Sequence, residues 1–116
     1  MIVGIGIDLI EVDRVKKTMA EHPRFLERIF TLEEIRYSQG KRNAAQHLAA
    51  RFAAKEAFFK ALGRRIAWAE VGVVNLPSGQ PWLEVRSAEN LGYSRAHLSL
   101  THLRAHAQAL VVLEKD

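Results

Sequence analysis

The segment from Asn43 to Gly63 constrains the fold of this chain more than any other. Asn43 and Gln46 have the spacing of a capping box, which marks a helix start, and Gly63 is a typical helix stop. The residues between them are rich in Ala, Phe and Leu and predict a helix of roughly 18 residues, about 27 Å long. Since this is the longest element in a chain of 116 residues, the rest of the fold is expected to pack around it.

The second half of this central helix is unusually charged for a segment that must bury much of its surface. Glu56 and Lys60 are four residues apart and share one face, as do Arg51 and Lys55. A carboxylate can hold a metal ion and nearby cations can hold phosphate, so the pattern suggests phosphate chemistry. The alternative is a weak salt bridge between Glu56 and Lys60, with lysines that extend from the helix flank to solvent.

A second carboxylate is available in the first strand, predicted over residues 2–10. Because side chains alternate along a strand, Asp8 shares one face with Ile2, Gly4, Gly6 and Ile10, opposite Val3, Ile5, Ile7 and Leu9. The two glycines either leave a shelf for an approaching ligand or relieve a contact with a packed helix. Asp8 and Glu56 are the best carboxylate pair in the chain, and two carboxylates suffice for Mg²⁺ with water and substrate phosphates.

The remaining patterns predict an α+β fold, with an antiparallel sheet packed on the long central helix in a single domain over residues 1–116. A helix is predicted over residues 11–21. Another opens at Thr31, where Glu34 completes a capping box and Phe30 with Ile35 forms a hydrophobic staple. In the second half, strands are predicted over residues 71–76, 82–86, 97–101 and 107–113, with a short helix over residues 87–92.

Composition narrows the chemistry. The chain has no cysteine, which excludes disulfides, a thiolate nucleophile and thiolate-bound zinc. Any metal site must therefore use carboxylate or imidazole, and oxygen ligands favour magnesium, calcium or manganese. Its net charge of +4 favours an anionic partner, whether nucleic acid, an acidic protein or a phosphorylated small molecule. No apolar run approaches the length of about 18 residues that a membrane helix needs, and the start lacks a signal peptide, so we expect a cytoplasmic protein.

One further polar motif, from Ser99 to His102, reads Ser-Leu-Thr-His and ends with His102 just past a predicted strand. Its hydroxyls and imidazole could bind phosphate, although a polar turn explains the same residues. Ser99 lacks the glycine-flanked elbow of a hydrolase nucleophile, and nothing in the sequence pairs it with a base.

Three motifs together resemble a known family, the small bacterial type of 4′-phosphopantetheinyl transferase, the holo-[acyl-carrier-protein] synthases. The motifs are Gly-Ile-Asp at residues 6–8, Arg-Phe-Ala-Ala-Lys-Glu-Ala-Phe-Phe-Lys-Ala-Leu-Gly at 51–63, and Ser-Leu-Thr-His at 99–102. The resemblance covers nearly the whole chain, and the central motif is highly specific. It departs after Gly63, where the family usually continues with small residues and this chain has Arg64 and Arg65.

The resemblance implies transfer of the 4′-phosphopantetheine arm of coenzyme A to a serine of apo acyl carrier protein, in fatty acid biosynthesis. It implies that Asp8 and Glu56 hold Mg²⁺ and that Lys60 assists the phosphates or the leaving group. Glu56 and a metal-bound water both remain candidates for the general base. The residues expected to bind coenzyme A are Arg51, Lys55, Lys60, Gly63, Ser99, Thr101 and His102.

The family also implies a homotrimer with sites between subunits, and an acidic carrier protein as partner. Basic residues that could dock the carrier are Arg14, which matches a family position, and Lys17, Arg24 and Arg28, which rest on charge alone.

Two other classes of function remain as alternatives. A nucleic-acid-binding module is disfavoured because the basic residues are scattered and no aromatic-basic strand motif is present. A Mg²⁺-dependent phosphohydrolase would use the same Asp8 and Glu56, with water in place of the carrier serine.

Overall fold

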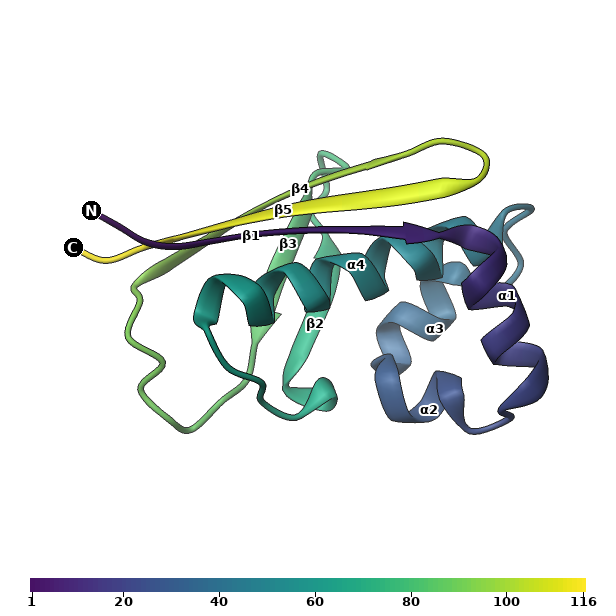
Figure 1. Cartoon of the computed structure of the whole chain (residues 1–116), viewed down its shortest axis with the longest axis horizontal. Helices are drawn as coiled ribbons and strands as arrows, with labels where there is room; N and C mark the ends of the chain where they lie inside the picture. Colours follow the sequence, from purple (N-terminus) through teal and green to yellow (C-terminus); the bar gives the residue numbers. More distant parts are fainter.

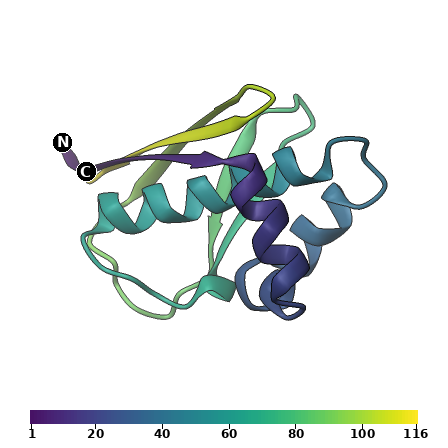
Figure 2. The same ribbon diagram turned by 45° about the vertical axis from the view of Figure 1, so that its right-hand side comes forward.

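The computed structural model describes residues 1–116, which form an elongated molecule of 41 × 25 × 25 Å around one central helix. A three-stranded sheet lies along one side of this helix, and three short helices gather at one end (Figures 1 and 2). In chain order the elements are β1 (Ile2–Glu11), α1 (Val12–Glu21), α2 (Phe25–Ile29), α3 (Leu32–Ser38), α4 (Ala44–Leu62), the 3₁₀ helix η1 (Trp68–Glu70), β2 (Val71–Asn75), β3 (Pro81–Val85), β4 (Arg95–His102) and β5 (His106–Glu114). None of the helices is long and apolar enough to cross a membrane.

The α+β prediction is confirmed, but the strands divide into two sheets. β1, β5 and β4 form one antiparallel sheet in that order, while β2 and β3 form a separate antiparallel hairpin. Pairing of β1 with β5 brings the two ends of the chain together, and Met1 and Lys115 exchange hydrogen bonds between their backbone atoms (Figure 1). The predicted helix at residues 87–92 is absent, because Ser87 and Asn90 bond to nearby backbone amides in turns instead.

The two predicted capping boxes have different outcomes. At the start of α3, the Thr31 hydroxyl accepts from the Glu34 amide and the Glu34 carboxylate accepts from the Thr31 amide, as expected. At the start of α4 the Asn43 side chain caps no backbone amide. Asn43 donates instead to the Gln46 side chain at 2.6 Å, so this capping box is wrong although the helix begins where it was predicted.

Two glycines in β1 set the distance between the sheet and α4. A Cβ atom built on Gly6 would lie 1.9 Å from the carbonyl oxygen of Ala57, and one on Gly4 would lie 2.0 Å from that of Ala61. Any side chain at these positions would therefore collide with the helix backbone. Of the two interpretations of these glycines, the structure shows the helix contact, and this contact holds Asp8 beside the charged part of α4.

Buried charges anchor α4 to α2, α3 and β2, which pack on the side of α4 away from the three-stranded sheet (Figure 1). Lys55 has no exposed surface, and its ammonium lies 2.6 Å from the Glu34 carboxylate and donates to the Ile29 carbonyl at 2.7 Å. Glu34 is also buried, and it accepts from the amide of Val73 in β2 at 2.9 Å. A single ion pair thus ties α3, α4 and β2 together and joins the end of α2 to them.

Candidate active site

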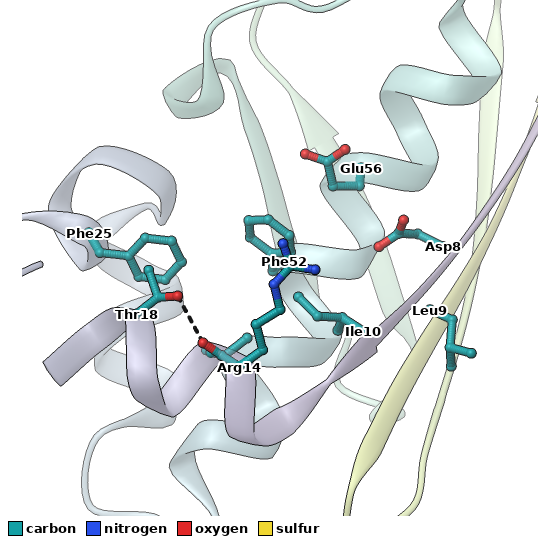
Figure 3. Close-up of a pocket in the computed structure, with 9 residues that line it drawn as sticks. Asp8, Leu9, Ile10, Arg14, Thr18, Phe25, Phe52 and Glu56 are labelled. Atoms are coloured by element: carbon teal, nitrogen blue, oxygen red, sulfur yellow. Dashed lines mark hydrogen bonds between the residues drawn. The ribbon is translucent and has the colours of Figure 1, made fainter. Parts of the chain in front are cut away.

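A cavity of about 420 Å³ lies between β1, α1 and α4, and both predicted carboxylates line it. Figure 3 shows Asp8 reaching it from β1 and Glu56 from α4, with Arg14 of α1 on the opposite wall. Its other lining residues are mainly apolar, namely Ile10, Val15, Thr18, Phe25 and Phe52; Leu9 also borders it, but its side chain points away to the outer face of the sheet (Figure 3). One side of the cavity is therefore acidic, the opposite wall carries the positive charge of Arg14, and apolar side chains line the space between them.

Each carboxylate in the cavity has its own cationic partner. Asp8 Oδ1 lies 3.0 Å from the ammonium of Lys60, which also donates to the Ile7 carbonyl at 2.9 Å. Glu56 accepts two hydrogen bonds from the guanidinium of Arg65, at 3.1 and 3.2 Å. The salt bridge between Glu56 and Lys60 that helix spacing allows is not formed, so that pairing is wrong, although the Lys60 side chain is half exposed at the helix flank.

Two carboxylates are donors of the kind that Mg²⁺ prefers, and they do not form a closed metal cage. The structure contains no cluster of three or more His, Cys, Asp or Glu side chains that could hold a metal. Mg²⁺ is usually bound by one or two carboxylates, several waters and substrate phosphates, so this open pair is what such a site requires. The side chains of Asp8 and Glu56 are only 16% and 17% exposed, and both already attract cations.

Lys55, predicted to bind coenzyme A, lies outside this cavity in the buried ion pair with Glu34. Burial lowers the pKa of its ammonium, and the Glu34 carboxylate opposes that effect. It neither reaches solvent nor faces the cavity. Its position in this chain supports a structural role, in which Lys55 fixes the rotation of α4 and so directs its neighbour Glu56 into the cavity.

Two other residues predicted to bind coenzyme A, Arg51 and His102, lie near each other in a separate cluster. The Arg51 guanidinium donates to Asn75 at 2.7 Å and lies over the ring of Tyr37. The ring of His47 packs edge-on against Tyr37 and lies 6.4 Å from that of His102. Burial, followed by the charge of Arg51, lowers the pKa of His47.

Ser99 and Thr101 lie on the outer face of the three-stranded sheet, away from α4. The register places Ser99 beside Leu110 and Ile7, and Thr101 beside Gln108 and Leu9. Within one chain the sheet therefore separates these hydroxyls from the carboxylate of Asp8, which projects from the inner face. Gly63, the last coenzyme-binding candidate, ends α4 with φ 83°, a left-handed conformation that favours glycine.

Three of the four predicted docking residues line connected cavities. Arg14 lines the carboxylate cavity, and Arg24 and Arg28 line a second cavity of about 560 Å³, which shares Thr18 and Phe25 with the first. Lys17 lines neither; its ammonium lies 4.0 Å from Glu21 on the exposed side of α1. The structure thus places three arginines along one continuous surface and leaves Lys17 apart.

Sequence reasoning missed two features of the site. Phe52 lies one helical turn before Glu56, and this i,i+4 spacing was a usable signal for the apolar wall. Arg65 contacts Glu56 only because the chain reverses after Gly63, and the guanidinium then rests on the rings of Phe59 and Trp68. No local sequence pattern indicates that contact.

Comparisons with known proteins place these features in a family. The profile of the 4′-phosphopantetheinyl transferase superfamily matches residues 4–111. The holo-[acyl-carrier-protein] synthase of Koribacter versatilis is 44% identical, with 98% of this chain and 99% of the relative covered. That of Geobacter sulfurreducens is 43% identical, with 99% of both chains covered.

Solved structures agree with the sequence relatives. A holo-(acyl-carrier-protein) synthase from Bacillus anthracis in complex with CoA (3′,5′-ADP) superposes with a TM-score of 0.86 and 38% identity, over 100% of this chain and 99% of the other. The synthase from Neisseria meningitidis gives a TM-score of 0.87 and 31% identity, over 99% of this chain and 100% of the other.

Proposed function

This chain belongs to the holo-[acyl-carrier-protein] synthases of the 4′-phosphopantetheinyl transferase superfamily, and we propose that the cavity between Asp8 and Glu56 is its active site. The enzyme transfers the 4′-phosphopantetheine arm of coenzyme A to apo acyl carrier protein, giving the holo carrier. The observation that carries the assignment of the site is the convergence of Asp8 and Glu56, 48 residues apart in the sequence, on one cavity, with Lys60 paired to Asp8 at 3.0 Å.

The proposed reaction is one displacement at phosphorus. The hydroxyl oxygen of the carrier serine forms a bond to the phosphorus that bears the pantetheine arm. The bond from this phosphorus to the bridging oxygen breaks, and 3′,5′-ADP leaves with the electron pair. A base accepts the serine proton. Since the nucleophile belongs to the partner, this chain needs to supply only positioning, charge stabilisation and the base.

Each proposed role follows from where the residue lies, either lining the cavity or bonded to a residue that lines it. Asp8 and Glu56 would hold Mg²⁺, which when bound neutralises charge on the pyrophosphate. Lys60, already directed at this position by its bonds to Asp8 and Ile7, would stabilise the negative charge of the departing phosphate. Glu56, whose carboxylate lines the cavity, could also accept the serine proton. The apolar wall at Phe52 and Phe25 suits the pantetheine arm.

Product analysis separates this proposal from a phosphohydrolase that uses the same carboxylates. The release of 3′,5′-ADP from coenzyme A and Mg²⁺ should require apo carrier protein, and a carrier whose acceptor serine is replaced by alanine should give none. Equal release with and without the carrier, together with free phosphopantetheine, would contradict transfer and favour hydrolysis.

The carrier protein is proposed to dock over α1 and α2. Arg14, Arg24 and Arg28 line the two connected cavities there, which offers a positive surface to an acidic partner. A carrier held on this surface would lie next to the carboxylates, so its serine could approach the coenzyme phosphates. Lys17 would make a weaker contact with the carrier. It lies on the same helix as Arg14 but points away from both cavities.

We expect Arg14→Glu to raise the KM for the carrier on the order of tenfold or more, since like charges repel across the docking surface. The kcat should change much less. Lys17→Glu is the matched control: the same charge reversal on α1 should raise this KM only slightly. Steady-state kinetics with varied carrier concentration measures both. An unchanged KM for Arg14→Glu would remove Arg14 from the docking surface.

A homotrimer with sites between subunits is also proposed. The outer face of the three-stranded sheet is apolar and uncovered: Ile5 is 66% exposed, Ile7 53% and Leu9 63%, beside Leu110. A large exposed apolar patch on a soluble protein usually marks an interface. Ser99 and Thr101 share this face, so a neighbouring subunit packed on it would bring these hydroxyls toward that neighbour's site.

Sedimentation equilibrium tests the assembly. The wild-type protein should sediment at three times its chain mass of 13.1 kDa. Ile5→Asp should dissociate it, because a carboxylate would be buried in the interface. Wild-type protein that sediments as a monomer at all concentrations would contradict the trimer. We also propose that the enzyme acts in fatty acid biosynthesis and is located in the cytoplasm, and cell fractionation would test the location.

A further inference from the structure

Arg65 occupies the carboxylate that the proposed function assigns to a metal ion. It lies in the loop between α4 and η1, nine residues after Glu56, and its two terminal nitrogens bond to the two oxygens of Glu56 at 3.1 and 3.2 Å. This two-point geometry is the strongest arrangement that an arginine can make with a carboxylate. Both oxygens on which a metal ion would depend are therefore already engaged by a positive charge.

Two aromatic rings hold the Arg65 guanidinium in place without enclosing it. Its central carbon lies 5.3 Å from the ring centre of Phe59 and 5.7 Å from that of Trp68. The side chain is nevertheless 63% exposed, while that of Glu56 is 17% exposed. Because its side chain is largely exposed, Arg65 can leave the carboxylate by rotating into solvent, whereas Glu56 stays fixed on α4.

Lys60 differs from Arg65 in this respect. Besides Asp8, the Lys60 ammonium bonds to the carbonyl oxygen of Ile7, so it keeps an acceptor when Asp8 binds something else. Arg65 makes no side-chain hydrogen bond except those to Glu56. A metal ion on both carboxylates would therefore leave Lys60 with one hydrogen bond, to Ile7, and would leave the Arg65 side chain with none.

We propose that Arg65 competes with the divalent metal ion for Glu56, so that metal binding displaces its guanidinium from the carboxylate. The inference rests on the proposed function, because it takes Glu56 as a metal ligand. The cause is electrostatic: a guanidinium and a divalent cation repel each other, and they share one acceptor. The anionic phosphates of coenzyme A reduce this repulsion, so Arg65 favours loading of the metal together with the coenzyme over loading of the metal alone.

Binding of Mn²⁺ without coenzyme measures this competition directly. In calorimetric or EPR titrations of the full chain, Arg65→Gln should lower the Kd for Mn²⁺ by about fivefold, or about 1 kcal/mol, as expected for a well-ordered, partly exposed ion pair. Arg65→Lys keeps the charge but loses the two-point geometry, so its Kd for Mn²⁺ should lie between those of wild type and Arg65→Gln. With coenzyme A present, the difference between wild type and Arg65→Gln should shrink.

Arg64→Gln is the matched control. Arg64 precedes Arg65 in the same loop, but its guanidinium pairs with Glu89 at 2.6 Å and lines no part of the carboxylate cavity. Its replacement removes the same net charge from the same loop and should leave the Kd for Mn²⁺ unchanged. An equal gain in affinity for Arg64→Gln and Arg65→Gln would mean that net charge, and not pairing with Glu56, sets the affinity.

The possible outcomes separate this inference from the proposed function. If wild type binds Mn²⁺ and Asp8→Asn does not, the metal site is supported, and an equal or higher Kd for Arg65→Gln then overturns the role of Arg65 alone. If neither wild type nor Arg65→Gln binds Mn²⁺, with or without coenzyme A, the metal assignment itself is contradicted, and the competition with it.

Discussion

Asp8→Asn and Glu56→Gln should each lower kcat/KM for transfer by at least about 10³-fold, since a catalytic metal ion contributes several kcal/mol of charge stabilisation. Both substitutions keep the size of the side chain and remove only its negative charge. The two carboxylates are the only ones that line the cavity, so nothing nearby can replace either of them. The transfer assay should be run with saturating Mg²⁺ and coenzyme A.

Glu89→Gln provides the control for these two variants. Glu89 is an exposed carboxylate that pairs with Arg64 outside the cavity, so its neutralisation should leave transfer near the wild-type level. Circular dichroism and thermal unfolding should show that all three variants remain folded. A folded Asp8→Asn or Glu56→Gln protein with near-native transfer would contradict the site.

The second large effect concerns the buried ion pair. Glu34→Gln should lower the free energy of unfolding by about 3–5 kcal/mol, because it leaves the Lys55 ammonium buried without a countercharge. The same change weakens the hydrogen bonds that Glu34 accepts from the amides of Thr31 and Val73. Urea denaturation at one fixed protein concentration measures the loss, since an oligomer would make stability depend on concentration.

A double variant distinguishes a structural Lys55 from one that binds coenzyme A. Adding Lys55→Met to Glu34→Gln removes the unpaired charge and should recover most of the lost stability. If Lys55 acts only by holding α4, the double variant should also keep its KM for coenzyme A. A KM that rises strongly in this folded protein would support the coenzyme contact that the family motif implied. A Glu34→Gln protein as stable as wild type would contradict the account of the ion pair.

Much of the fold was predictable because its signals are local. The central helix follows from a long run of Ala, Phe and Leu ended by Gly63, and α3 follows from the capping box of Thr31 and Glu34. The strands follow from runs of apolar and β-branched residues. What could not be predicted depends on long-range contacts, such as the division of the strands into two sheets and the pairing of Glu34 with Lys55 across 21 residues of sequence.

The candidate site was predictable in part for the same reason. Asp8 and Glu56 stood out because the charges lie in otherwise apolar segments, and the structure brings both to one cavity. Asp8 lies close to α4 because Gly4 and Gly6 let β1 approach the helix backbone, which is the second of the two interpretations given for these glycines. Two cations differ from the expectation. Lys55 was expected in the site but is buried away from it, whereas the chain reversal after α4 brings Arg65 to Glu56.

The intact mass of apo acyl carrier protein after incubation with this chain, coenzyme A and Mg²⁺ tests the central claim most directly. The account predicts a gain of one phosphopantetheine arm on the carrier, which is lost when Asp8 is replaced by Asn in the enzyme. A carrier of unchanged mass in the presence of folded wild-type protein would contradict it.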